Sequence, residues 1–147
     1  MEKSKKIILI GKTGSGKTTL IQSIEEQNIT DLKTQTVQNY MHFIDTPGEY
    51  LENRGYYKAL IVSSYDADVI GLVQDCSTDD AWLPPMFASV FIKETIGIVT
   101  KIDLAENAKQ IQLAKELLLQ AGATKIFYVS AINNHGTEDI AKYISEV

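Results

Sequence analysis

Residues 6 to 19, KIILIGKTGSGKTT, constrain the fold more than any other stretch of the chain. The apolar run Ile7–Ile10 has the length and branching of a buried strand, and a glycine-rich loop follows it directly. The loop from Gly11 to Thr18 fits the pattern G-x-x-x-x-G-K-[ST], between a strand and a helix as that pattern requires. We therefore predict a loop that wraps an anion with its backbone N–H groups.

Two side chains of this loop have predicted roles of their own. Lys17 is expected to reach the β- and γ-phosphates of a nucleotide, and the Thr18 hydroxyl to ligate Mg²⁺. The other residues expected to surround the phosphates are Gly11, Lys12, Thr13, Gly14, Ser15, Gly16 and Thr19.

Short apolar runs alternate with segments of helical period along the whole chain, which is typical of a parallel sheet covered on both faces. The predicted strands are Ile7–Ile10, Met41–Ile44, Val69–Val73, Thr95–Thr100 and Ile126–Val129, and the predicted helices are Lys17–Gln27, Asn53–Ser63, Pro85–Lys93, Asn107–Ala121 and Thr137–Glu146. Residues 28–40 read as a loop with a short edge strand. We expect residues 1–147 to form one domain with a three-layer α/β P-loop NTPase fold and a mainly parallel sheet of about five or six strands.

Charge and composition exclude several classes of protein. The 147 residues carry 14 Lys and Arg against 19 Asp and Glu, a net charge of -5, which disfavours binding to nucleic acid or to an anionic membrane. No apolar run approaches the roughly 20 residues that span a bilayer. The single cysteine, Cys76, suits a reducing compartment. We therefore expect a cytoplasmic protein.

A second motif, HFIDTPG at residues 42–48, places a carboxylate at the end of a predicted strand. Asp45 could hold magnesium there, and Gly48 could bring its backbone N–H close to a γ-phosphate. The sequence Asp-Thr-Pro-Gly is also a good β-turn, so this interpretation depends on the phosphate loop before it. Thr34 is the favoured further magnesium ligand; Thr36 is the other candidate, and turn capping by both threonines remains open.

A third motif, Thr100-Lys101-Ile102-Asp103, follows the run Thr95–Val99 and predicts recognition of guanine. The Asp103 carboxylate could accept hydrogen bonds from N1–H and the N2 amine of guanine, whereas adenine would leave it unpaired. Lys101 would lie along the base and bond back to the phosphate loop. Ser130-Ala131 could direct a backbone N–H at the guanine oxygen. The alternative for Asp103 is a cap on the following helix.

Taken in order, these motifs resemble the small GTPases of the translation-factor-related P-loop class. The segment DTPGEYLEN at 45–53, the triplet Lys33-Thr34-Gln35 and Ala59-Leu60-Ile61 resemble more closely the EutP/PduV family of ethanolamine- and propanediol-utilisation proteins, over essentially the whole chain. The resemblance implies a cytoplasmic partner, either shell or enzyme proteins of a bacterial microcompartment. It also implies acetate kinase activity as a competing function.

The chain departs from ordinary small GTPases at several positions. Thr100 stands where asparagine is more usual, so the side-chain bond that braces the phosphate loop is expected to be shorter or absent. Glu49 follows Gly48 and could orient water, but it could equally be an acid that favours a helix start. Arg54 is the one arginine of the sequence, which argues against a lid-type kinase and predicts slow hydrolysis.

The sequence therefore predicts a protein that binds GTP or GDP with Mg²⁺ and hydrolyses GTP slowly, with Lys17, Glu49 and Arg54 as candidate catalytic residues. Two alternatives stay open: an ATP-dependent acetate kinase, and a nucleotide-gated scaffold without turnover. The sequence does not indicate an oligomeric state.

Overall fold

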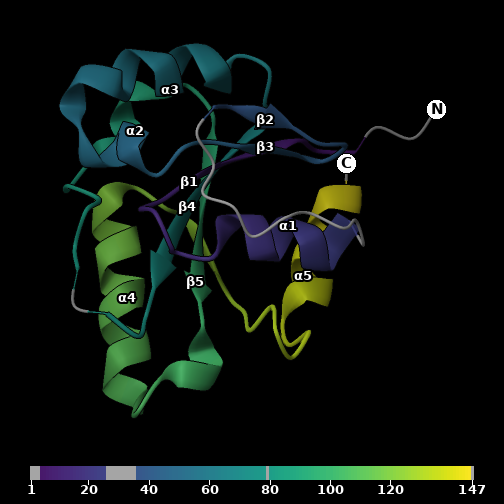
Figure 1. Ribbon diagram of the computed structural model, residues 1–147, viewed down its shortest axis with the longest axis vertical. Coiled ribbons are helices and arrows are strands. Elements are labelled where there is room, and N and C mark those ends of the chain that lie inside the picture. The colour runs from purple at the N-terminus through teal and green to yellow at the C-terminus, as the bar shows by residue number, and fades with distance from the viewer. Residues whose placement is uncertain (1–3, 26–35, 79, 147) are drawn as a thin grey trace.

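The apolar run before the glycine-rich loop forms β1 (Ile7–Ile10), a central strand of a six-stranded sheet in the computed structural model (Figure 1). The structure describes residues 4–25, 36–78 and 80–146. The strand order is β2-β3-β1-β4-β5-β6, in which β2 pairs antiparallel with β3 and the other neighbours are parallel. The remaining strands are β2 (Gln38–Asn39), β3 (Phe43–Asp45), β4 (Val69–Asp75), β5 (Glu94–Thr100) and β6 (Lys125–Tyr128).

Helices cover both faces of this sheet, as Figure 1 shows. They are α1 (Lys17–Glu25), α2 (Glu49–Glu52), α3 (Tyr57–Ser64), α4 (Ala108–Ala121) and α5 (Thr137–Ser145). Helices α2, α3 and α4 pack on one face, and α1 and α5 on the other. The three-layer α/β fold expected from the sequence is confirmed.

The two cores follow from the alternation of side chains along each strand. In β1, Ile8 and Ile10 join the core beneath α3 and α4, while Ile7 and Leu9 join the core beneath α1 and α5. All four side chains are buried, because β1 is covered on both faces and paired on both edges. A continuous apolar run is therefore the pattern that this position requires.

After β1 the chain adds β3 along one edge of that strand, and it then crosses over to add β4 along the other edge. Such a reversal opens a crevice at the carboxyl ends of the central strands, where open α/β sheets bind ligands. The glycine-rich loop begins at that end of β1.

Three predicted elements differ from the observed ones. The strand predicted at Met41–Ile44 begins at Phe43, because the Tyr40 N–H donates to the Phe43 carbonyl and makes residues 41–42 the turn of a β2–β3 hairpin. The helix predicted at Asn53–Ser63 is interrupted near its start. Asn53 is extended and accepts a hydrogen bond from the Gly55 N–H, which separates α2, a 3-10 helix at Arg54–Tyr56 and α3.

The helix predicted at Pro85–Lys93 is reduced to a 3-10 helix at Phe87–Val90. Met86 has a positive φ of 61° and donates its N–H to the Gln120 carbonyl in α4, so the backbone cannot begin a helix there. Phe87 and Phe91 still pack into the core. The last two residues of the helix predicted at Lys17–Gln27 lie outside the described residues.

The other predictions hold closely. The long helix ends at Gly122, which is left-handed as a C-cap glycine should be, and the short edge strand predicted within 28–40 is β2. None of the helices in the described part of the chain combines the length and apolar character needed to cross a bilayer.

Candidate functional site

The glycine-rich loop turns sharply between β1 and α1 and presents backbone N–H groups at the start of that helix. Gly16 has a φ of +100°, a conformation that side-chain-bearing residues rarely adopt. The helix N-terminus adds partial positive charge to the loop. The local geometry is therefore that of an anion cradle.

Lys17 lies inside this cradle and is nearly buried, with 6% of its surface exposed. Its Nζ donates to the carbonyl oxygens of Gly11 at 2.8 Å and Lys12 at 3.2 Å. Burial lowers the pKa of Lys17 to about 8, and the carboxylates of Asp45 and Glu52 act in the opposite direction. The loop therefore holds a desolvated cation beside two carboxylates.

The side chains of Thr18 and Asp45 meet at the edge of the cradle. The Thr18 Oγ1 donates to Asp45 Oδ2 at 2.7 Å, and Asp45 is fully buried at the end of β3. Hydroxyl and carboxylate oxygens are the donors that Mg²⁺ takes in proteins, so these two residues fit magnesium. No group of three or more His, Cys, Asp or Glu side chains within the described residues is arranged to hold a metal ion.

The proposed third magnesium ligand cannot be placed in the same way. Thr34 lies outside the described residues. The alternative, Thr36, is exposed, and its hydroxyl accepts a hydrogen bond from Gln38 Nε2 at 2.9 Å.

The segment after Asp45 packs directly on the phosphate loop. Thr46 donates its hydroxyl to the Leu9 carbonyl at 2.7 Å, and a Cβ built on Gly48 would lie 2.1 Å from the Thr13 backbone nitrogen. Only glycine permits so close an approach of two backbones. Gly48 is therefore beside the cradle, as the sequence predicts.

A carboxylate from α2 reaches the phosphate loop, and it comes from Glu52. Glu52 Oε2 accepts the Thr13 N–H at 3.1 Å and the Thr13 hydroxyl at 2.8 Å. Glu49, the acid that the sequence predicts beside the phosphate, is exposed at the start of α2, and Arg54 is exposed in the 3-10 helix after it. Glu52 lies three residues after Glu49, about one helical turn, so both side chains lie on the same side of α2. This spacing is the one signal in the sequence that could have pointed to Glu52.

A second region of the site borders a cavity of about 230 Å³ at the far end of the loop. It is lined by Gly16, Thr19, Thr100, Lys101, Asp103, Leu104, Ala131 and Ile132. The structure thus brings together three parts of the chain: Gly16 of the phosphate loop, the motif Thr100-Lys101-Ile102-Asp103 (the TKID motif), and Ala131. Asn107 caps α4 by accepting the Gln110 N–H, so the alternative role of Asp103 as that cap is wrong.

Ser130 and Ala131 do not contribute equally to this cavity. The Ser130 N–H donates to the His135 carbonyl at 2.9 Å, and the His135 N–H donates to the Ser130 carbonyl in the same antiparallel bridge. That N–H is therefore engaged within the protein. Ala131 is the residue of the pair that lines the cavity.

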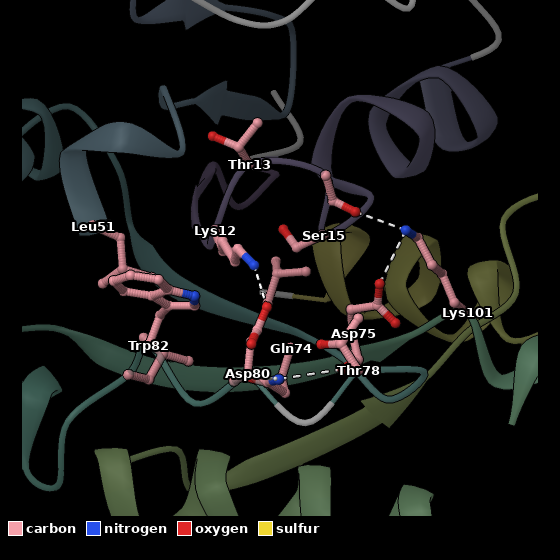
Figure 2. Close-up of a pocket in the computed structure, with 13 residues that line it drawn as sticks. Lys12, Thr13, Ser15, Leu51, Gln74, Asp75, Thr78, Asp80, Trp82 and Lys101 are labelled. Carbon is pink, nitrogen blue, oxygen red and sulfur yellow. Dashed lines mark hydrogen bonds and ion pairs between the residues drawn. The ribbon is translucent and has the colours of Figure 1, made fainter.

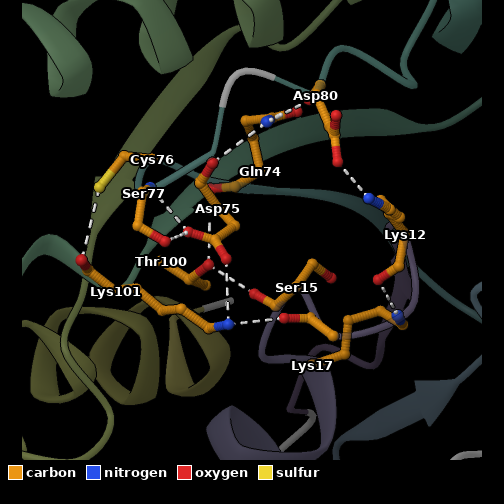
Figure 3. Close-up of polar contacts among 11 residues, drawn as sticks. Lys12, Ser15, Lys17, Gln74, Asp75, Cys76, Ser77, Asp80, Thr100 and Lys101 are labelled. Carbon is orange, nitrogen blue, oxygen red and sulfur yellow. Dashed lines mark hydrogen bonds and ion pairs between the residues drawn. The ribbon is translucent and has the colours of Figure 1, made fainter. Parts of the chain in front are cut away.

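Thr100 and Lys101 tie the end of β5 to the phosphate loop (Figure 3). The Thr100 Oγ1 donates to the Ser15 carbonyl at 2.5 Å, and Lys101 Nζ donates to the Gly14 carbonyl at 2.7 Å. Lys101 also pairs with Asp75 at 3.0 Å, and Asp75 accepts two bonds from Ser77. The bracing bond, expected to be shorter or absent without asparagine, is therefore present and comes from the threonine hydroxyl.

We expect Thr100→Val to remove this brace at nearly constant volume. Thr100 is 2% exposed, so an unpaired carbonyl at Ser15 should lower the free energy of unfolding by about 1–2 kcal/mol and weaken GDP binding. Urea unfolding and calorimetric titration measure the two effects. Thr124→Val is the matched control, because its hydroxyl donates to the Thr95 carbonyl far from the loop. Equal losses of GDP affinity in both variants would contradict the assignment.

A second, smaller cavity of about 170 Å³ lies against the outer side of the loop (Figure 2). Lys12 points into it, where its ammonium pairs with Asp80 and lies 5.7 Å from the centre of the Trp82 ring. Leu51 of α2 lines the same cavity. The Lys12 side chain is thus held on this outer side, and its contribution to the cradle is through its backbone.

Comparison with known proteins identifies relatives over nearly the full length. A family model described as ethanolamine utilisation and propanediol utilisation, PduV-EutP, matches residues 4–146. The chain is 41% identical over 143 residues to the propanediol utilization protein PduV of Citrobacter freundii, covering 96% of this chain and 93% of that protein. It is 28% identical over 142 residues to the probable acetate kinase EutP of Escherichia coli strain K12, covering 95% of this chain and 87% of that protein.

Solved structures show the same fold at low sequence identity. The GTPase Era from Aquifex aeolicus, in a structure with GDP and AlF4, superposes with a TM-score of 0.68 and 22% identity, covering 99% of this chain and 58% of that chain. The bacterial selenocysteine-specific elongation factor EF-Sec gives a TM-score of 0.69 and 22% identity, covering 97% of this chain and 28% of that chain. The fold is that of the P-loop GTPases.

Proposed function

The chain belongs to the PduV-EutP family of ethanolamine and propanediol utilisation proteins, and we propose that it binds GTP and hydrolyses it slowly with magnesium. The observation that carries this proposal is the cavity bordered by Asp103, which adjoins the end of the phosphate loop. A nucleotide would lie with its phosphates in the loop and its base in this cavity.

Recognition of the base rests on Asp103. Its carboxylate would accept hydrogen bonds from N1–H and the N2 amine of guanine, and adenine offers no such pair of donors. Lys101, fixed by its bonds to Gly14 and Asp75, would cover one face of the base. The Ala131 N–H is the remaining donor for the guanine oxygen.

At the phosphate end, Thr18 and Asp45 would hold magnesium, which supplies positive charge against the phosphate oxygens. Lys17 would exchange its bonds to the Gly11 and Lys12 carbonyls for bonds to phosphate oxygens. The loop N–H groups would orient the nucleotide along the cradle.

Slow hydrolysis follows from what surrounds the position of the terminal phosphate. Glu49 is exposed beside Gly48, and Arg54, the one arginine of the sequence, is exposed in the 3-10 helix after α2. Within the described residues, no hydrogen bond or ion pair joins either side chain to the loop. Without an arginine at the transferring phosphoryl group, turnover falls by roughly 10³–10⁵, and a partner would supply the missing charge.

A second candidate function is an ATP-dependent acetate kinase, since the relative in Escherichia coli strain K12 is named probable acetate kinase EutP. The observation that favours it is the pair of donors on Thr13, which already hold a carboxylate beside the cradle. Acetate could use the same donors once Glu52 is displaced. A nucleotide-gated scaffold without turnover is the third possibility, and it would use the same cradle.

The proposed setting is the cytoplasm, with shell or enzyme proteins of a microcompartment as partners. This assignment rests on the family to which the chain belongs. The net charge of -5 also supports a protein partner over nucleic acid.

Calorimetric titration of nucleotide-free protein with GTP, GDP and ATP in magnesium, followed by measurement of phosphate release with and without acetate, distinguishes these functions. We expect preference for guanine nucleotides and slow release of phosphate that acetate does not change. Equal or tighter binding of ATP, with formation of acetyl phosphate, would replace the GTPase assignment by the kinase. Guanine preference without any release would favour the scaffold.

A further inference from the structure

The contact between Glu52 and Thr13 places a negative charge at a site built for a phosphate. The carboxylate accepts a backbone N–H of the phosphate loop at 3.1 Å and the hydroxyl of the same residue at 2.8 Å. Backbone N–H groups of this loop are the donors that a nucleotide phosphate uses. Glu52 therefore satisfies part of the cradle with an internal anion.

The Lys17 ammonium lies beside the same peptide unit of the loop. Its Nζ donates to the Lys12 carbonyl at 3.2 Å, and that carbonyl belongs to the peptide unit whose N–H, on Thr13, donates to Glu52. A terminal phosphate would contact the same ammonium. Glu52 thus accepts a loop N–H from the peptide unit that also bonds the lysine, and both groups would bind that phosphate.

We propose that Glu52 competes within the molecule for the place of the γ-phosphate and thereby makes the protein discriminate GDP from GTP. The inference rests on the proposed function, because it concerns a nucleotide in the same cradle. A diphosphate is shorter by one phosphoryl group and leaves Glu52 on Thr13. A triphosphate brings its terminal negative charge against the carboxylate, and the like charges repel at short range.

Displacing Glu52 would move α2 as a unit. The helix has four residues and ends at the extended residue Asn53, while Gly48 at its start abuts the Thr13 backbone nitrogen. Leu51 lies between these points and lines the outer cavity together with Trp82, as Figure 2 shows. A triphosphate would therefore change the surroundings of Trp82, the single tryptophan of the sequence.

The test compares Glu52→Gln with the unmodified protein by calorimetric titration with GDP and with a non-hydrolysable GTP analogue in magnesium. Glutamine keeps the shape of the side chain and removes its charge. We expect affinity for the analogue to rise about tenfold, equivalent to about 1.4 kcal/mol, and affinity for GDP to change by less than about threefold. Glu116→Gln, on the exposed side of α4, makes the same change of charge away from the loop and should alter neither affinity.

Trp82 fluorescence tests the same inference without any variant. The analogue should change the emission of the unmodified protein, and GDP should leave it as it is. Equal effects of Glu52→Gln on both nucleotides, or an emission that the analogue does not change, would overturn the inference while guanine binding stands. Failure of the unmodified protein to bind either nucleotide would instead overturn the proposed function, and the inference with it.

Discussion

Lys17→Ala is expected to abolish measurable binding of GTP and GDP, with a loss of affinity of about 100-fold or more. The Lys17 ammonium is held inside the cradle by the Gly11 and Lys12 carbonyls and is the buried cation of the loop. Truncating one member of a buried, hydrogen-bonded charge pair costs about 2–5 kcal/mol. Calorimetric titration with each nucleotide in magnesium measures the loss.

Lys17→Met separates a loss of binding from a loss of folding. Methionine leaves the Gly11 and Lys12 carbonyls without the lysine donor, but it also removes a charge that burial disfavours, as the lowered pKa of Lys17, about 8, shows. Because these two effects oppose each other, the free energy of unfolding should change by less than about 1 kcal/mol. Loss of binding in a variant that unfolds at the same urea concentration would support the cradle. Retained affinity in both variants would contradict the role of Lys17.

Asp103→Asn is expected to exchange guanine for xanthine as the preferred base. The amide of asparagine offers a donor, which pairs with the C2 carbonyl of xanthine and opposes the N2 amine of guanine. Leaving a polar group of the site unpaired costs about 1–3 kcal/mol of binding free energy. The affinity for GTP should therefore fall about 10- to 100-fold, and the affinity for xanthosine triphosphate should rise. Competition titration with the two triphosphates measures the exchange.

Stability provides the control for Asp103→Asn. Asp103 is exposed, and Asn107 rather than Asp103 caps α4, so the midpoint of urea unfolding should not change. Affinity for ATP should also stay as it is in the unmodified protein. Unchanged preference for guanine would remove Asp103 from the site and leave the 230 Å³ cavity without an assigned ligand.

The elements that the sequence predicts well are those whose pattern is local. The bounds of β1 match the apolar run, and α4 follows the helical period up to its C-cap at Gly122. The segment Pro85–Lys93 has apolar residues at helical spacing too. It does not form that helix, because a bond from Met86 to Gln120 and a positive φ override the local preference.

The residues of the candidate site also fall into those that a local motif predicts and those that only a tertiary contact places. The phosphate loop, the pair Thr18 and Asp45, and the meeting of the TKID motif with Ala131 follow from motifs at the ends of parallel strands. Glu52 does not belong to any of these motifs. Its partner Thr13 is 39 residues away, and such a contact depends on how α2 docks on the loop.

The sequence by itself determined most of the succession of strands and helices along the chain and the glycine-rich loop that forms the anion cradle. These features arise from backbone geometry and side-chain period, which act over a few residues. Tertiary structure decided which acid reaches the loop, that the Thr100 hydroxyl braces it, and that the Ser130 N–H is already engaged. The first two contacts join segments that lie far apart in the sequence, so the packing of the layers sets them and local sequence does not record them. The third is a backbone bridge to His135, which became visible only with the path of the loop after β6.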